Sequence, residues 1–271
     1  MKLYFSVVSH LHHDILIQLN TLKRLAEHPD IEVIFRDNIQ TGELKQYCAD
    51  HNIQYVSNEV EKGFATNNNL NYLLAQSEGM QPEDYFVLLN PDISIDEVML
   101  NRLVELTKTS SDALMTVNLF LDEEKTLFDD NLRAYPRFIN FIRNYVFGDR
   151  STVIDKTQPT DDKECWSSAA FLVVKAGLYQ RLQGLDETYF MYCEDIDFCL
   201  RASQIGERVK FVPEVEAIHY RHRCSQQFLS RAFFRHVKSV LLFTLAKHRL
   251  RRHKSILVTS SQSNTCEIQQ H

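Results

Sequence analysis

Hydrophobic residues in the first half of the chain alternate between the two-residue period of a strand and the 3.6-residue period of a helix. Leu3–Val8 is predicted as a strand, and the apolar residues of His12–His28 repeat on one helical face. The next predicted elements are strand Ile31–Arg36, helix Leu44–Ala49, strand Ile53–Val56, helix Asn67–Gln76, strand Tyr85–Leu89, helix Ile95–Thr107 and strand Ala113–Phe120. This order predicts an α/β fold with a mainly parallel sheet between two layers of helices.

The second half of the chain is less regular. Residues 122–164 contain one predicted helix, Arg137–Phe147, and an irregular segment this long is usually functional or mobile. The pattern then predicts strand Trp166–Val174, a helix that starts at Glu194, strands Arg208–Val212 and Val215–His219, and a last helix at about 226–248. Residues 1–225 are expected to form one domain, residues 226–254 a basic amphipathic helix, and residues 255–271 a disordered tail.

Composition and charge narrow the function classes. The 271 residues are 44% hydrophobic and 24% charged, as in ordinary globular proteins, and the net charge of −6 does not favour a nucleic-acid partner. The six cysteines have no zinc-site spacing and are expected to be buried free thiols in a reducing compartment. No signal-peptide pattern and no apolar run of about 20 residues is present, which predicts a cytoplasmic protein, either soluble or peripheral to a membrane.

Two common nucleotide-binding motifs are missing from the sequence. None of the seven glycines has Gly-x-Gly spacing, so the dinucleotide fingerprint is absent. There is also no Gly-Lys-Ser/Thr sequence, which excludes a P-loop.

Three carboxylates stand at the start of the helix that follows an aromatic run at residues 189–192. Glu194, Asp195 and Asp197 occupy its first turn, where free backbone N–H groups and the helix dipole favour negative charge. One of them facing outward would serve as a general base. The structural alternative is an ordinary acidic first turn, with Asp197 and Arg201 at the spacing of a helix salt bridge.

Polar residues follow several predicted strands at their carboxyl ends, where ligands gather in parallel sheets. Asp37, Asn38, Asn90 and Asp92 all have this position. Asp92 could hold a divalent cation, although most Asn-Pro-Asp sequences form a turn or a helix cap. His219 ends a later strand, where a packing role is the more common one.

Taken in order, these motifs resemble the family 2 glycosyltransferases of the GT-A fold, and more narrowly the bacterial rhamnosyltransferases that assemble O-antigen and related polysaccharides. The resemblance covers nearly the whole chain. It is carried by Val7-Val8-Ser9-His10, Arg36-Asp37-Asn38, Gly63-Phe64-x3-Asn68-Asn69, Leu89-Asn90-Pro91-Asp92-Ile93, Trp166-x4-Phe171-Leu172-Val173, the run from Gly184 to Asp197, and Val212-Pro213-x5-His219.

The resemblance implies a nucleotide-sugar half at about 1–120 and an acceptor half at about 121–225. Ser9, Asp37, Asn38, Asn68, Asn90 and Asp92 would bind the nucleotide sugar, with Asp37 accepting the N3–H of a uracil or thymine base. Asp92 and His219 would hold a divalent cation, Mg²⁺ or Mn²⁺. Asp195 would be the catalytic base beside Glu194, and Trp166 would wall the acceptor side.

Two positions depart from the family pattern. Asn90 stands where relatives have a first metal-motif acid, which lowers the ligand charge. Ala169 stands where many relatives have glycine.

The expected activity is inverting transfer of L-rhamnose from dTDP-L-rhamnose to a polyprenyl-diphosphate-linked saccharide. A different donor, such as a UDP-hexose, is the alternative within the family. A glycoside hydrolase with paired carboxylates and a non-catalytic saccharide-binding protein are alternatives of other classes. An amphipathic stripe in the last helix is followed by the basic run 247–254, which would place the enzyme on the inner face of the bacterial cytoplasmic membrane. The alternative is a closing helix packed on the core.

Overall fold

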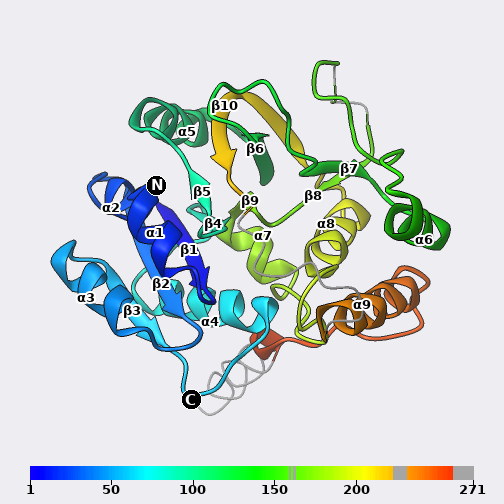
Figure 1. Ribbon diagram of the computed structural model, residues 1–271, viewed down its shortest axis with the longest axis horizontal. Helices are drawn as coiled ribbons and strands as arrows, with labels where there is room; N and C mark the ends of the chain where they lie inside the picture. Colours follow the sequence, from blue (N-terminus) through cyan, green and yellow to red (C-terminus); the bar gives the residue numbers. More distant parts are fainter. Residues whose placement is uncertain (159, 161–162, 222–230, 259–271) are drawn as a thin grey trace, which may run out of the picture.

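The computed structural model describes residues 1–158, 160, 163–221 and 231–258. Within these residues one eight-stranded sheet, in the order β3-β2-β1-β4-β9-β6-β10-β5, forms the centre of the molecule (Figure 1). Its strands are β1 (Leu3–Ser9), β2 (Ile31–Asp37), β3 (Gln54–Ser57), β4 (Tyr85–Leu89), β5 (Ile93–Ser94), β6 (Leu114–Phe120), β9 (Phe171–Lys175) and β10 (Lys210–His219). The predicted α/β fold is confirmed.

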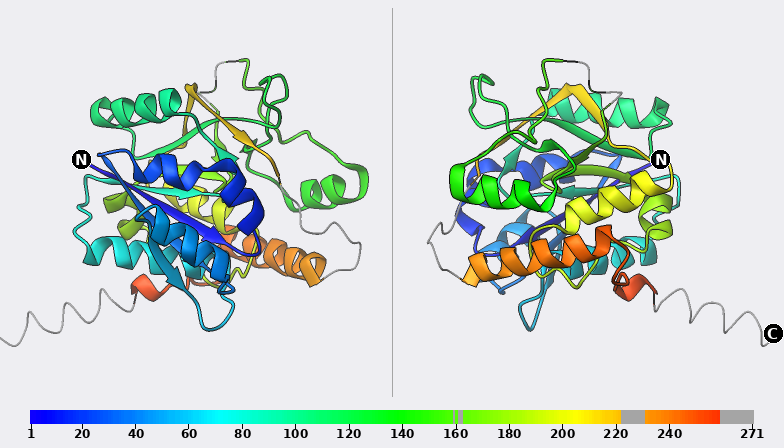
Figure 2. Two further views of the ribbon diagram at one scale, coloured as in Figure 1. Left: turned by 60° about the vertical axis from the view of Figure 1, so that its left-hand side comes forward. Right: turned by 90° about the vertical axis from the view of Figure 1, so that its right-hand side faces the viewer.

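Helices cover both faces of the sheet, as Figure 2 shows. The helices within the described residues are α1 (His13–Leu19), α2 (Thr21–Ala26), α3 (Gly42–Asp50), α4 (Phe64–Ser77), α5 (Glu97–Thr109), α6 (Phe138–Phe147), α7 (Ala176–Arg181), α8 (Glu194–Gln204) and α9 (Arg231–Lys247). Of these, α6 and α9 pack on each other, and α9 also packs on α8. Alternate residues of each strand pack against opposite layers of helices. Phe5 and Val87 face α1, α2, α3 and α5, whereas Tyr4 and Phe86 face α4, α7 and α8. Strands covered on both faces read as continuous apolar runs, which explains why they are visible in the sequence.

The direction of one central strand was not predicted. β1, β2, β3 and β4 are parallel, and β6 is parallel to β10. β9 lies between β4 and β6 and runs antiparallel to both. Strand direction depends on how the chain returns to the sheet, and the apolar pattern of residues 171–175 carries no sign of it.

Four predicted elements are divided differently in the structure. The helix expected at 12–28 is two helices, because Asn20 adopts a left-handed backbone with φ of 54° and ends α1. The strand expected at 166–174 is β9 preceded by the short β8 (Cys165–Ser167), which pairs with β7 (Leu132–Ala134) in a separate sheet. The two strands expected at 208–219 are one strand, β10, with an irregularity between Val212 and Glu216.

The C-terminal region packs on the domain over its described part. Val240 and Phe243 of α9 belong to a small apolar cluster with Tyr189, Cys193 and Ile196. Ser255 and Leu257 are buried, so the prediction of a disordered tail starting at residue 255 was wrong for these positions. The rest of that prediction, residues 259–271, lies outside the described residues.

Four cysteines within the described part of the chain are buried free thiols, as predicted: Cys48, Cys165, Cys193 and Cys199. Cys224 and Cys266 lie outside it.

Candidate active site

A cavity of about 440 Å³ opens where the chain leaves the carboxyl ends of the central strands. Asn90, Trp166, Glu194, Asp195 and His219 all line it, although they come from four distant parts of the sequence. Asp92 lies next to the cavity-lining His219: Oδ1 of Asp92 is 3.3 Å from Nε2 of His219. The structure therefore brings the two predicted halves of the site to one place.

His219, at the end of β10, is held between two carboxylates. Its Nδ1 lies 2.7 Å from Oδ2 of Asp129, and Arg221 donates to Oδ1 of the same residue at 2.6 Å. Burial opposes charge on both partners, but the ion pairs outweigh it: they raise the pKa of His219 to about 9 and lower the pKa of Asp129 to about 2. In this arrangement the imidazole is protonated and bridges Asp92 and Asp129.

The donor set of Asp92, His219 and Asn90 suits a hard divalent cation. It offers carboxylate and amide oxygens and one imidazole nitrogen, all of which are ligands for such ions. Because Asp129 fixes Nδ1, the other ring nitrogen, Nε2, faces Asp92 and is the one that would bind a cation, as in carboxylate–histidine–metal arrangements. A cation would have to replace the proton on Nε2.

The two adjacent acids at the start of α8 differ in environment. Asp195 is partly buried, and its carboxylate accepts the backbone N–H of Ile196 at 2.8 Å and that of Ala169 at 3.4 Å. Burial raises the pKa of Asp195 to about 6, although these N–H groups oppose the shift. Asp195 is thus ionised at neutral pH, with a pKa suited to a general base.

Glu194 is the more deeply buried of the pair. Oε2 of Glu194 has no hydrogen-bond partner among the described residues. Burial, and then the neighbouring charge of Asp195, raise the pKa of Glu194 well above its ordinary value. Glu194 therefore favours its neutral form, and Asp195 is the member of the pair that ionises more readily.

A second, smaller cavity of about 180 Å³ adjoins the first. Both cavities are lined by Arg133, Trp166, Tyr192, Glu194 and Asp195, so the two adjacent acids stand between them. The indole N–H of Trp166 donates to the carbonyl of Ala134 at 3.2 Å, which fixes the ring in this wall.

The residues expected to bind a nucleotide base lie side by side at the ends of β1 and β2. Ser9 and Asp37 are register partners, and the N–H of Asn38 donates to the carbonyl of Ser9 at 2.9 Å. The Asp37 carboxylate is buried and already accepts bonds from the N–H groups of Ile39 and Thr41 and from two hydroxyl groups. Its contact with a base stays a prediction.

Asn68 is turned into the protein. Its Oδ1 accepts the Ser6 hydroxyl at 2.7 Å, and its Nδ2 donates to the carbonyl of Phe64 at 3.0 Å. Both polar groups are used between α4 and β1, so a direct bond to the nucleotide would require their rearrangement.

Comparison with known proteins now decides the family. The chain is 36% identical over 252 residues to Rhamnosyltransferase WbbL of Escherichia coli K12, covering 91% of this chain and 94% of that protein. The chain belongs to the family 2 glycosyltransferases, in the rhamnosyltransferase group. It is also 23% identical over 247 residues to the N-acetylglucosaminyl-diphospho-decaprenol L-rhamnosyltransferase of Mycobacterium tuberculosis, covering 85% and 79% of the two chains. No family model matches the chain.

Solved structures confirm the GT-A fold of this glycosyltransferase. The mannosyltransferase PcManGT of Pyrobaculum calidifontis, in complex with GDP-Man and Mn²⁺, matches with a TM-score of 0.58 at 12% identity. The match covers 93% of this chain and 66% of that one. S. aureus TarS 1-349 in complex with UDP-GlcNAc also gives 0.58, at 14% identity, over 90% and 67% of the two chains.

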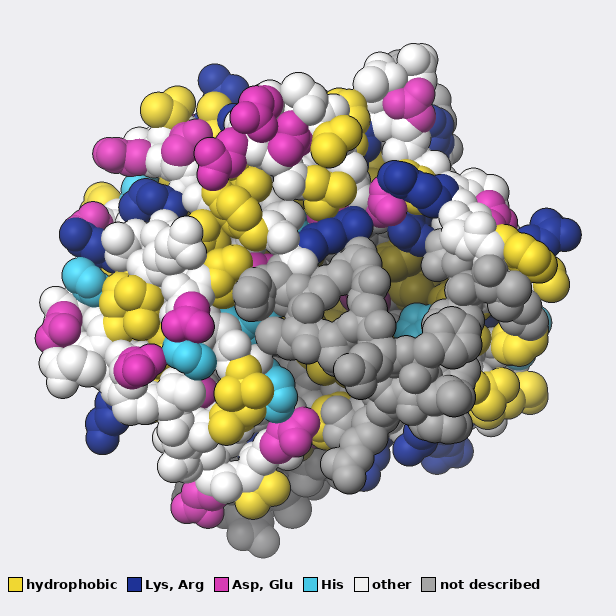
Figure 3. Space-filling view, viewed as in Figure 1, with side chains coloured by type: hydrophobic (Ala, Val, Ile, Leu, Met, Phe, Trp, Pro, Cys, Tyr) yellow, Lys and Arg dark blue, Asp and Glu magenta, His cyan; other side chains and the backbone are white. Residues whose placement is uncertain are grey.

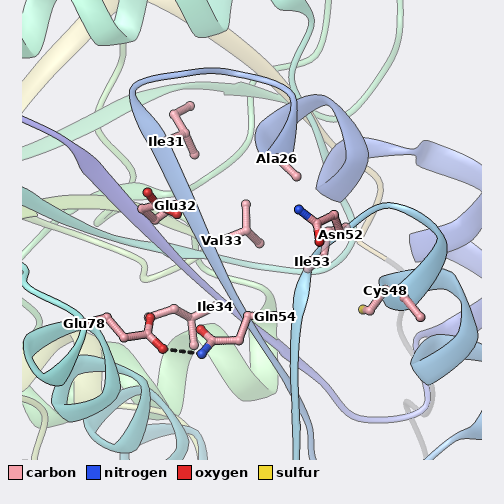
Figure 4. A pocket seen from close by; sticks show the side chains of 11 residues that line it. Ala26, Ile31, Glu32, Val33, Ile34, Cys48, Asn52, Ile53, Gln54 and Glu78 are labelled. Carbon is pink, nitrogen blue, oxygen red and sulfur yellow. Dashed lines mark hydrogen bonds between the residues drawn. The ribbon is translucent and has the colours of Figure 1, made fainter.

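Two other features of the glycosyltransferase do not form a site of this kind. A hollow of about 460 Å³ lies at the opposite, amino-terminal ends of β2 and β3, and Figure 4 shows Glu78 bonded to Gln54 there. Asp186, Asp197 and His253 lie close enough to share an ion. Arg251 and Arg201 already pair with those two carboxylates, which makes this cluster a structural junction.

Several charged residues in the cavity wall of the glycosyltransferase were not predicted from the sequence. Asp129 and Arg221 hold His219, and Arg133 bonds Asp130 beside them at 3.2 Å. The available signal was the Asp129-Asp130-Asn131 run inside the irregular segment, together with an arginine two residues after His219.

Replacing Asp195 by Asn is expected to stabilise the glycosyltransferase at high pH. Below about pH 4, Asp195 is protonated in both the folded and the unfolded protein. Between pH 4 and 6 it is ionised only in the unfolded chain, where it has the ordinary pKa of 3.8. Above pH 6 it is also ionised in the folded protein, which then carries the full free-energy cost of the buried charge. Asp195→Asn should therefore raise the unfolding midpoint at pH 8, and the gain should vanish towards pH 4.

Thermal unfolding monitored by circular dichroism across this pH range measures the effect. Asp122→Asn is the matched control, because the hydrogen bond from Thr126 lowers the pKa of Asp122 and predicts the opposite sign. A midpoint that Asp195→Asn leaves unchanged at pH 8 would show that the buried charge of Asp195 does not destabilise the folded protein.

Proposed function

We propose that the enzyme transfers L-rhamnose from dTDP-L-rhamnose to a lipid-linked saccharide during bacterial surface polysaccharide synthesis. The observation that carries this proposal is the convergence of Asp195, Asn90 and His219 on one cavity in a chain 36% identical to a rhamnosyltransferase. The name of the mycobacterial relative, an N-acetylglucosaminyl-diphospho-decaprenol L-rhamnosyltransferase, supports an acceptor of the polyprenyl-diphosphate class.

In this proposal Asp195 removes the proton of the acceptor hydroxyl as that oxygen attacks the sugar. Its pKa of about 6 leaves it ionised at pH 7 yet basic enough to accept the proton. The acceptor sugar enters from the smaller cavity, against Trp166 and Tyr192. Neutral Glu194 donates a hydrogen bond to substrate rather than accepting a proton.

The donor occupies the rim formed by the ends of β1, β2 and β4. Ser9, Asp37 and Asn38 hold the nucleoside, and Asn90 and Asp92 lie towards the diphosphate. Asn68 supports this rim from behind through its bond to Ser6.

A divalent cation, Mg²⁺ or Mn²⁺, is proposed at Asp92 and His219. When bound, such an ion neutralises charge on the departing diphosphate. The residues of the chain prepare the site: Asp129 holds the ring of His219, and Arg221 holds Asp129.

Asp129→Asn is expected to weaken Mn²⁺ binding about tenfold to hundredfold, because it replaces the carboxylate that orients a ligand histidine by a neutral amide. Calorimetric titration of Mn²⁺ in the presence of dTDP measures the change. Asp130→Asn is the control, since that neighbouring carboxylate pairs with arginines. Equal effects of the two substitutions would count against His219 as a ligand.

Rhamnose transfer is tested directly with purified enzyme, dTDP-L-rhamnose and a short-chain lipid-diphosphate N-acetylglucosamine acceptor. Asp195→Asn should lower kcat about 10²- to 10⁴-fold, the usual contribution of a general base, while dTDP binding persists. Glu194→Gln should cost less than about tenfold, because it replaces a group that is already neutral.

UDP-glucose and UDP-galactose serve as competing donors in the same assay. Turnover with a UDP-hexose but not with dTDP-L-rhamnose would show that the transferred sugar is not rhamnose. Release of sugar to water without any nucleotide donor would overturn the transferase mechanism. Full activity of the Asp195→Asn variant would show that Asp195 is not the catalytic base.

We also propose that the enzyme works on the inner face of the cytoplasmic membrane, held by α9 and the basic run after it. Val237, Leu241 and Leu245 form an exposed stripe on α9, and Figure 3 shows hydrophobic and basic side chains along the edge over α6 and α9. The sequence between Glu216 and Glu267 contains ten Lys and Arg residues and no acid. This combination suits a surface of anionic lipid. Over the described residues, no helix is long and apolar enough to cross a bilayer.

Leu241→Asp should reduce co-sedimentation with vesicles containing anionic phospholipid, because it puts charge into the apolar stripe. Val98→Asp is the control, since Val98 is equally apolar and exposed but lies on α5. Similar binding of both variants would show that the stripe does not contact the membrane.

A further inference from the structure

The turn that leads into the catalytic acids has an unusual backbone. Tyr192 and Cys193 both have φ of 70°, the left-handed region that favours glycine. Cys193 is the N-cap of α8 and makes no side-chain capping bond. Two such residues in succession persist only where the surrounding structure holds them.

α9 supplies one set of these restraints. The hydroxyl of Ser239 donates to the carbonyl of Met191 at 2.8 Å, directly before the turn. Val240 and Phe243, one and four residues later, pack against Cys193 within the same apolar cluster. The ring of Tyr192 meets the ring of His236 edge-on, at 5.0 Å between centroids.

The segment after α9 supplies a second set. Arg251 donates to the carboxylate of Asp186 and, at 3.1 Å, to the hydroxyl of Thr188. Its guanidinium lies 4.8 Å from the centroid of the Tyr189 ring. The Tyr189 hydroxyl in turn donates to Asp197, in the first turn of α8, at 3.4 Å.

The same loop is fixed on its other side by α4. The N–H of Phe64 donates to the carbonyl of Phe190 at 3.0 Å. A Cβ at Gly63 would lie 2.7 Å from that oxygen, so only glycine allows the approach. The catalytic turn is therefore held between a helix of the donor side and the C-terminal region.

We propose that Ser239 and Arg251 are positioning residues, through which α9 and the segment after it aim Asp195 at the acceptor hydroxyl. This inference rests on the proposed role of Asp195 as the base. Neither residue lines the two cavities, so each acts through the turn and not by touching substrate.

A positioning role differs measurably from a purely structural one. α9 packs on α6 and α8 at the edge of the molecule, so losing one bond to the turn should change its geometry more than the stability of the sheet (Figure 1). A displacement of about 1 Å at a reacting group can cost a hundredfold in rate. The donor rim lies on other elements and should be unaffected.

Ser239→Ala and Arg251→Gln are compared with wild type in the transfer assay, using a water-soluble acceptor so that membrane binding does not enter. Each should lower kcat about tenfold to hundredfold, with the affinity for dTDP within about twofold. Arg251→Lys keeps the charge beside Asp186 and should recover part of the loss. Circular dichroism and the thermal midpoint establish that each variant is folded.

The controls remove similar groups from places that do not touch the turn. Thr244→Ala deletes a hydroxyl of α9 that bonds only within the helix, to the carbonyl of Val240. Arg181→Gln, at the end of α7, breaks the ion pair of Arg181 with Glu207. Both should keep wild-type kcat.

Two outcomes overturn the inference. The first is wild-type kcat in folded Ser239→Ala and Arg251→Gln, with Asp195→Asn inactive; it removes the positioning role and leaves the proposed function intact. The second is a fall in dTDP affinity equal to the fall in kcat, which would indicate a general structural defect. Activity of Asp195→Asn would instead refute the proposed function itself.

Discussion

Two neighbouring carboxyl groups in a buried setting are the constraint on which this candidate active site depends. Glu194 and Asp195 stand in one helical turn, and burial raises the pKa of both. The pKa of Glu194 lies well above its ordinary value, whereas two backbone N–H bonds oppose the rise at Asp195. The fold thus makes Asp195 the acid of the pair that ionises more readily.

One short loop connects Asp195 to the end of β4. Between β8 and β9, the carbonyl of Ala170 accepts the N–H of Asn90 at 2.8 Å, and the N–H of Ala169 reaches Asp195. The loop takes this place because β9 runs antiparallel between β4 and β6 and so begins at the edge where β4 ends. The antiparallel direction of β9, which was not predicted from the sequence, therefore brings Asn90 and Asp195 to the same loop.

The sequence predicted what depends on local pattern. Apolar runs identified Tyr85–Leu89 and other strands buried on both faces, and strand ends located Asp37 and Asn90. The break at Asn20 and the split of residues 165–175 depend on backbone conformation and pairing partners, which hydrophobicity does not encode. The Asp129–His219–Arg221 group joins residues about ninety positions apart, and only the packing of β10 beside β6 creates it.

Support for the turn before α8 comes from residues later in the sequence, and this has a consequence for the order in which the fold is completed. Ser239 and Arg251 follow α8 and every strand of the described central sheet, so the ribosome adds them after all of those elements. A nascent chain that stops before Ser239 would contain those strands and α8 but would lack the bonds from α9 and the segment after it that hold the turn at Tyr192 and Cys193.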